Sequence, residues 1–246
     1  MPVVATIFLG VPFCAGQSPA QHITDTNAVS WWIYTGDHTI SDHWGVFTEI
    51  QARRAHFLAI WQQLVIRNAA TYRFSPHVQV AAGYVWTRTG RYGDFPAPKP
   101  YLAHRAYEQL VLKQEFKHLD IEHRYRVEQR WLQNFTSGDA YSWGYDNRFR
   151  YQLKGTLPIS KAGDEGQRWH LFGAGEVLLH SGPNHGPDIF NQTRALGGIG
   201  YRFSMQNKIE FAYQHQYLAQ RNGRIYESNH GLRVQFSSTA KLFRKG

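Results

Sequence analysis

The feature that most constrains this chain is a two-residue alternation of apolar and charged side chains, clearest over residues 121–131. Successive side chains of a β-strand point to opposite sides, so a strand here has two different faces. One face carries Ile121, His123, Tyr125, Val127, Gln129 and Trp131, and the other carries Glu122, Arg124, Arg126, Glu128 and Arg130. On a helix the same charged residues would spread around the cylinder. The segment is therefore predicted to be a strand with one mostly apolar face and one charged face.

The same alternation recurs from one end of the chain to the other, and nearly all charged residues of the predicted strands fall on one parity. Short connections alternate with longer polar ones, a pattern typical of outer-membrane barrels. The recognisable strands are residues 29–36, 43–54, 57–73, 77–88, 104–116, 119–133, 143–157, 167–180, 191–204, 207–218 and 226–238. Because single-chain bacterial barrels have an even number of strands, we expect an all-β fold: one antiparallel transmembrane β-barrel of about twelve strands, or of ten.

The composition favours a membrane barrel with a charged interior and an aromatic, apolar exterior. Aromatic residues make up 15% of the 246 residues although the mean hydropathy is -0.49. No segment approaches the ~20 apolar residues of a membrane-spanning helix, so crossing a membrane requires a closed barrel. Tryptophans near predicted strand ends fit the aromatic belts at the two membrane interfaces: Trp31, Trp32, Trp44, Trp86, Trp131 and Trp143. A soluble lipocalin-like barrel stays open as an alternative, because alternation does not tell which face is inside.

The ends of the chain suggest export. Residues 1–16 resemble a secretory signal peptide, with an apolar stretch followed by Cys14-Ala15-Gly16 as a cleavage site, although the usual positive start is missing. Cys14 is the only cysteine, so no internal disulfide can form. The expected organisation is a signal peptide at 1–16, a lead-in at 17–28, one barrel domain at 29–238 and a tail at 239–246. The expected location is the outer membrane of a Gram-negative bacterium.

Short sequence blocks, taken in their order along the chain, resemble a known family. They are residues 49–53 (EIQAR), 104–110 (HRAYEQL), 124–130 (RYRVEQR), 149–153 (FRYQL), 191–194 (NQTR) and 198–203 (GIGYRF). Together they resemble the bacterial barrel family called domain of unknown function 2490, over roughly residues 29–238. This chain departs from the family at Ala103, where a glutamate is usual. The resemblance implies an outer-membrane barrel of ten to twelve strands and implies no activity.

The charged parity supplies the candidate site, a set of residues expected to face the lumen and any solute in it. The set is Glu49, Arg53, Arg67, Arg105, Glu122, Arg124, Arg126, Glu128, Arg130, Arg148, Arg150, Lys154, Glu176 and Arg194. Two interpretations stay open. The residues pair with one another and fill a barrel with a structural or accessory role. Alternatively, the excess of arginine over glutamate lines a narrow porin-like channel that favours anionic solutes such as acidic oligosaccharides.

No enzyme is predicted, but one alternative belongs to that class. Ser228 and His230 share a parity and could face lipid side by side, as a lipid hydrolase would require. No metal or cofactor is expected, because the histidines lack ligand spacing. The predicted partners are outer-membrane lipids, lipopolysaccharide, the barrel-assembly machinery during insertion and an anionic solute. Nucleic acid is not expected, because arginines and glutamates alternate instead of forming a basic surface patch.

Overall fold

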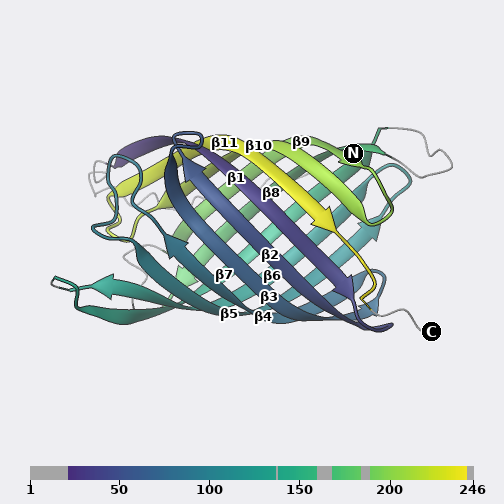
Figure 1. The fold of residues 1–246 in the computed structure, drawn as a ribbon, viewed down its shortest axis with the longest axis horizontal. Helices are drawn as coiled ribbons and strands as arrows, with labels where there is room; N and C mark the ends of the chain where they lie inside the picture. The colour runs from purple at the N-terminus through teal and green to yellow at the C-terminus, as the bar shows by residue number, and fades with distance from the viewer. Residues whose placement is uncertain (1–21, 137, 160–167, 184–188, 243–246) are drawn as a thin grey trace, which may run out of the picture.

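The computed structural model describes residues 22–136, 138–159, 168–183 and 189–242, and these residues form a closed β-barrel (Figure 1). The predicted signal peptide and its cleavage site lie outside the described residues. The strands are β1 (Ile23–Thr39), β2 (Trp44–Ala55), β3 (Ile60–Ser75), β4 (Val78–Thr89), β5 (Tyr101–Glu115), β6 (Asp120–Phe135), β7 (Tyr141–Pro158), β8 (Trp169–Ser181), β9 (Phe190–Arg202), β10 (Asn207–Ala219) and β11 (Ile225–Ser238). No helix in these residues is long and apolar enough to span a membrane.

The strand number corrects the sequence prediction. The described residues form eleven strands instead of about twelve, and the eleven match the segments marked by alternation. Sequential strands pair antiparallel, so the first and the last strand of an odd set run in the same direction. β1 and β11 accordingly close the barrel as a parallel pair, from Ile23↔Ile225 to Gly36↔Ser238. The error came from applying the even-number rule to a pattern that already gave the right count.

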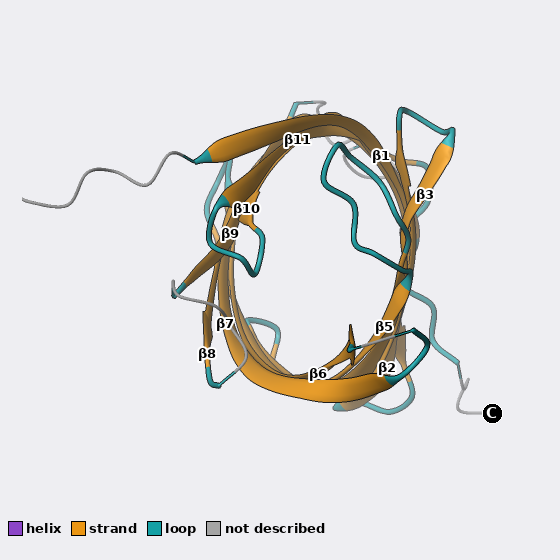
Figure 2. Cartoon of the chain, turned by 90° about the vertical axis from the view of Figure 1, so that its left-hand side faces the viewer, coloured by secondary structure: helices purple, strands orange, loops and turns teal. Residues whose placement is uncertain are grey.

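The two ends of the barrel differ. At one end, here called the loop end, the connections include residues 56–59, 90–100 and 220–224. The other, the turn end, has four short connections, 40–43, 76–77, 116–119 and 203–206, and one longer one, 159–168. β1 and β11 both begin at the loop end, which lies on the left in Figure 1 and faces the viewer in Figure 2.

The loop of residues 90–100 folds over the mouth of the barrel (Figure 2). Tyr92 donates a hydrogen bond from its hydroxyl to Glu227 at 2.7 Å, and the Asp94 amide donates to Asp25 at 3.2 Å. Gln220 donates its side-chain amide to the Phe95 carbonyl. Burial, followed by the neighbouring Glu227 carboxylate, raises the pKa of the Tyr92 hydroxyl well above its ordinary value, so Tyr92 stays a donor. The loop thus partly covers the lumen at this end.

The alternation separates the two faces of the wall as predicted for most strands. Large apolar side chains such as Val127, Phe149 and Leu171 are exposed on the outside, and charged side chains lie inside. The interior is not wholly charged, however. Buried apolar side chains lie on two stretches of the inner wall, one of which is Val65, Ala69, Ala81, Val85 and Tyr107, and the other Val29, Trp31 and Ile33.

β1 differs from its prediction in two ways. It begins at Ile23 instead of residue 29. The alternation did not mark this first part because the inner face there carries the polar side chains of Asp25 and Asn27. Trp31 was placed in an aromatic belt, yet it is 2% exposed and packs inside the barrel, whereas Trp32 is 40% exposed. Both parities of this strand are apolar here, so the sequence pattern does not distinguish inside from outside.

Gly231 allows the parallel pair to close. It lies opposite Val29, and a Cβ atom added at Gly231 would lie 1.7 Å from the Val29 carbonyl oxygen. Backbone atoms cannot move aside without separating the two strands, so glycine is required for this close approach.

Candidate functional site

Glu128 is the centre of a network of buried charges on β6 and β7. Its carboxylate, with the residue 0% exposed, accepts contacts from Arg148 Nη2 at 2.5 Å and Arg150 Nη1 at 2.7 Å. Arg126 Nη1 lies 3.7 Å away. Strand register explains the geometry, because Glu128 pairs with Arg148 and Arg126 pairs with Arg150 across the two strands. Side chains at paired positions lie within reach of one another on the same face.

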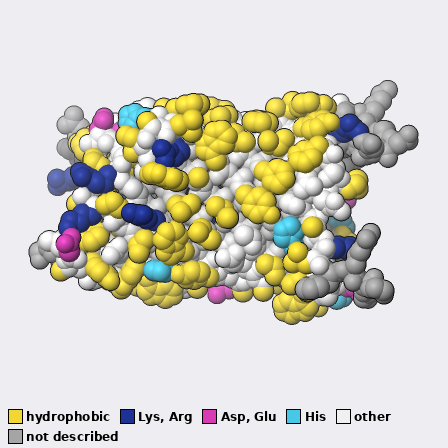
Figure 3. Space-filling model, viewed as in Figure 1, with side chains coloured by type: hydrophobic (Ala, Val, Ile, Leu, Met, Phe, Trp, Pro, Cys, Tyr) yellow, Lys and Arg dark blue, Asp and Glu magenta, His cyan; other side chains and the backbone are white. Residues whose placement is uncertain are grey.

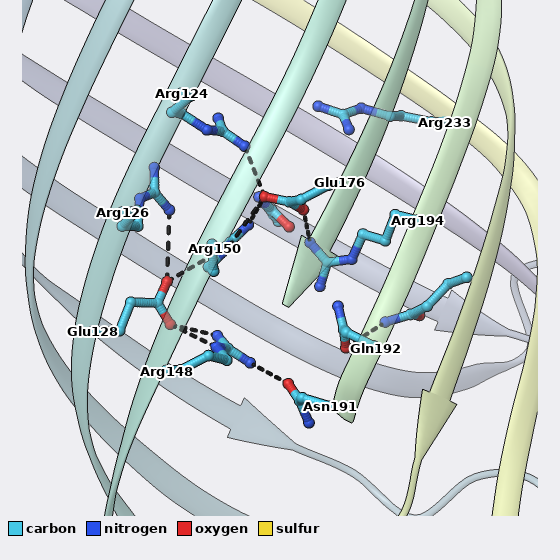
Figure 4. Close-up of polar contacts among 12 residues, drawn as sticks. Arg124, Arg126, Glu128, Arg148, Arg150, Glu176, Asn191, Gln192, Arg194 and Arg233 are labelled. Carbon is cyan, nitrogen blue, oxygen red and sulfur yellow. Dashed lines mark hydrogen bonds and ion pairs between the residues drawn. The ribbon is translucent and has the colours of Figure 1, made fainter. Parts of the chain in front are cut away.

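Glu176 on β8 is the second carboxylate of the network (Figure 4). It contacts Arg150 at 2.6 Å and both Arg124 and Arg194 at 3.1 Å. Arg150 therefore bridges Glu128 and Glu176, which links β6, β7, β8 and β9 through side chains inside the barrel. Arginine suits this role because its planar guanidinium offers several donors in fixed directions.

The network continues towards the opposite wall. Arg67 on β3 and Glu49 on β2 form an ion pair at 2.5 Å. The Tyr107 ring lies between the two halves, with the guanidinium carbon of Arg67 5.7 Å and that of Arg126 4.7 Å from its centre. We call this set the ionic belt; it comprises Glu49, Arg67, Arg124, Arg126, Glu128, Arg148, Arg150, Glu176 and Arg194.

Trp31 joins the belt to β1. The guanidinium carbon of Arg53 lies 3.7 Å and that of Arg194 5.1 Å from a ring centre of Trp31, both close enough for cation–π attraction. The indole nitrogen donates to Gln62 at 3.2 Å. Gln62 is turned inward where the register between β2 and β3 shifts at Arg53 and Arg54, so a β-bulge positions this contact.

Two cavities lie inside the barrel. The loop-end cavity has a volume of about 720 Å³, and Arg105, Arg148 and the loop residue Tyr92 are among its lining residues. The turn-end cavity is about 160 Å³, with Glu122 and Lys154 in its wall. The two cavities share no lining residue. Arg67, Arg148, Arg150 and Arg194 line the loop-end cavity, Glu49 and Arg124 line the turn-end cavity, and the remaining belt residues, Arg126, Glu128 and Glu176, line neither. The belt therefore lies between the two cavities.

The charges of the belt do not cancel. Three carboxylates, Glu49, Glu128 and Glu176, face six arginines in the belt itself. Arg130 adds a two-point pair with Asp146, with both contacts at 2.6 Å. Burying a charge is costly unless it is paired and hydrogen-bonded. The interior therefore combines well-paired arginines with a surplus of positive charge.

All fourteen residues of the sequence-predicted set lie on the inner side of the wall. Ten are buried: Glu49, Arg53, Arg67, Arg105, Arg126, Glu128, Arg130, Arg148, Arg150 and Glu176. The other four, Glu122, Arg124, Lys154 and Arg194, are partly buried and line a cavity. The structure brings nine of the fourteen into the belt, while Glu122 and Lys154 lie in the turn-end cavity.

Sequence reasoning missed several interior groups. Asp146 shares the parity of Arg148 and was a recognisable candidate for that reason. Trp31 and Tyr107 were not, because aromatic side chains were expected on the outside. The contribution of Tyr92 depends on a loop folding over the mouth, for which the sequence carries no signal.

The predicted neighbours Ser228 and His230 do meet on the outer wall. Ser228 Oγ lies 3.0 Å from Nε2 of His230 and 3.0 Å from Nε2 of His215. The Tyr213 hydroxyl lies 2.6 Å from Nδ1 of His230. Within the described ranges, no group of three or more His, Cys, Asp or Glu side chains is arranged to hold a metal ion.

Comparison with known proteins gives the family. The profile described as "Protein of unknown function (DUF2490)" matches residues 28–227. The chain belongs to this family. The resemblance read from the sequence blocks is thereby confirmed. Among curated proteins, none matches the chain significantly. One solved structure, titled "NanC porin structure in rhombohedral crystal form", is 12% identical with a TM-score of 0.47, and the match covers 82% of this chain and 93% of that one.

Proposed function

We propose that this member of the DUF2490 family is an integral outer-membrane β-barrel with a structural or accessory role in the envelope. Its lumen is closed at mid-height by the ionic belt. The observation that carries the proposal is the separation of the two cavities by buried, mutually paired charges such as Glu128 and Arg148. Barrels of about eight strands are filled by side chains and those of about 16–18 strands leave an aqueous channel, so this barrel is narrow enough for long side chains to meet across it.

The outer surface supports insertion into a membrane. One side of the barrel is largely covered by apolar side chains, and its Lys and Arg side chains gather towards the loop end (Figure 3). A continuous apolar surface is unfavourable in water but matches the lipid-facing band of a membrane barrel. The shortest strands have 12 residues and the longest 18. At a rise of about 3.3 Å per residue and a tilt near 45°, such strands span an apolar band of about 25 Å.

The difference between the barrel ends supports one orientation. Outer-membrane barrels have short turns on the periplasmic side and longer loops outside. The turn end therefore faces the periplasm, and the loop end with its 720 Å³ cavity faces the exterior. Lipids and lipopolysaccharide surround the wall in this arrangement, and insertion requires the barrel-assembly machinery.

The membrane position predicts how tryptophan fluorescence responds to lipid. Trp32 is exposed on the outer wall and Trp31 is buried inside, so of these two neighbours brominated acyl chains should reach Trp32 and not Trp31. In vesicles of brominated lipid, we expect Trp32→Phe to lower the quenched fraction of the fluorescence and Trp31→Phe to leave the quenched intensity unchanged. Equal effects of the two substitutions, or no quenching in the wild type, would contradict a lipid-facing outer wall.

A lipid hydrolase is the second candidate, and the contact between Ser228 and His230 favours it. Under the non-enzymatic proposal, cellular lipid A and phospholipid profiles stay the same when Ser228→Ala or His230→Ala replaces the wild type. Ser142→Ala, which changes an exposed serine of β7, is the matched control. Profiles altered by both site substitutions but not by the control would support hydrolysis and contradict the main proposal.

A further inference from the structure

We propose that the loop-end cavity binds a small organic anion, a hydroxyl-bearing molecule with a carboxylate or phosphate group, and that Arg105 and Arg53 hold its acidic group. The inference rests on the proposed function in one respect. Because the ionic belt closes the floor of the cavity, the anion is bound from the exterior and is not conducted.

The size and enclosure of the cavity suit a small molecule. Its volume of about 720 Å³ falls within the range of roughly 300–1,000 Å³ that ligand pockets occupy. The loop of residues 90–100 lies over the mouth, and Tyr92, Phe95 and Pro96 of this loop contribute to the lining. Belt residues Arg148 and Arg150 line its deep side. A ligand there contacts protein on several sides.

Arg105 is a cation of the cavity without a carboxylate partner among the described residues. It lies on β5, is 9% exposed and lines the cavity, yet no carboxylate in the described part of the chain pairs with it. Its Nε atom is buried without a hydrogen-bond partner. Three other arginines of the lining have carboxylate partners: Arg130 has Asp146, Arg148 has Glu128 and Arg194 has Glu176. An unpaired buried charge is strongly unfavourable, so an anion from outside would supply the missing partner.

Arg53 is a second cation without a carboxylate partner among the described residues. Its guanidinium donates to the amide oxygens of Gln51 and Gln63. Its guanidinium carbon lies 3.7 Å from a ring centre of Trp31, and this contact fixes the orientation of the group. Neutral amides leave the positive charge uncompensated, and a fixed guanidinium loses little freedom when it binds a carboxylate or phosphate.

The remaining lining indicates the rest of the ligand. Among the ionisable side chains that line the cavity, Glu227 is the one carboxylate set against nine Lys and Arg residues. It already accepts hydrogen bonds from Tyr92 and Gln220. The lining also includes many amides, such as Gln62, Gln63, Gln133, Asn134, Gln192 and Gln216. Amides both donate and accept hydrogen bonds, as hydroxyl groups do. A polar, hydroxyl-bearing anion therefore matches the cavity better than an apolar one.

Calorimetric titration of the full chain, refolded in detergent, tests the site. The probes are glucuronate for a carboxylate, glucose 6-phosphate for a phosphate and glucose as the neutral control. We expect at least one of the two anions to bind and glucose not to bind. Added salt should lower the affinity for the anion. Binding of glucose as strong as that of both anions, or no binding of either anion, would overturn the proposal.

Matched substitutions assign the two cations. Arg105→Gln and Arg53→Gln should each lower the affinity for the anion about tenfold or more, as expected for loss of a charge-assisted hydrogen bond. Arg224→Gln removes the same charge from an exposed position at the loop end and should leave affinity unchanged. Equal affinity of wild type and Arg53→Gln, or equal weakening by Arg224→Gln, would overturn the assignment. Arg53 keeps the test decisive even if the Arg105 variant fails to refold.

The two proposals fail separately. Anion binding combined with conductance steps in planar bilayers would contradict the closed lumen and leave the binding site standing. Absence of both conductance steps and anion binding would contradict the binding site and remain consistent with a closed lumen.

Discussion

At the scale of single residues, the interior depends on a few carboxylates that each hold several arginines. Glu128 and Glu176 together contact five different guanidinium groups. Removing one partner of a buried ion pair leaves the others uncompensated, and this costs more than the pair itself contributes. The carboxylates are therefore the positions where one substitution has the largest effect on the belt.

Glu128→Gln should lower the free energy of unfolding by about 3–5 kcal/mol, because Arg148 and Arg150 lose their charge partner in a buried site. Urea titration in lipid vesicles measures this change. Glu115→Gln, at the exposed end of β5, is the matched control and should change the value by no more than about 0.5 kcal/mol. An effect of Glu128→Gln as small as that of the control would show that the belt does not stabilise the barrel.

At the scale of strands, the sequence predicts positions well where the two faces differ in chemistry. The strand predicted at residues 119–133 is β6, Asp120–Phe135, because its charged and apolar residues alternate. β1 was less well predicted, since Trp31 and Trp32 are chemically alike and occupy opposite faces. The pairing of particular charges was also beyond the sequence, because it depends on register between strands such as Glu128↔Arg148.

Closure between β1 and β11 depends on Gly231. We expect Gly231→Val to place its Cβ atom against the Val29 carbonyl oxygen, separate the parallel pair and prevent a stable barrel. The heat-modifiable shift of the folded barrel in electrophoresis is the measurement. Gly175→Val is the control, because a Cβ atom at Gly175 meets no atom within 4 Å. A Gly231→Val barrel as stable as the control would refute the role given to this glycine.

At the scale of the whole molecule, eleven strands place the start of β1 and the end of β11 at opposite ends of the barrel. The inner face of the wall carries both the apolar stretches of β1 and β3–β5 and the charged belt. The chain has 27 Lys and Arg against 18 Asp and Glu. The lining of the loop-end cavity has the same excess, with nine Lys and Arg against one carboxylate. The molecule is therefore a closed β-barrel with an electropositive cavity at its loop end.

Conductance in planar lipid bilayers tests the closed lumen most directly, with insertion checked by co-flotation of the protein with vesicles. We predict no conductance steps for the wild type, because in our proposal the ionic belt closes the lumen between the loop-end cavity and the turn-end cavity. Anion-selective steps that decrease in Arg126→Glu and Arg150→Glu would contradict the account, since those arginines would then line an open path for anions.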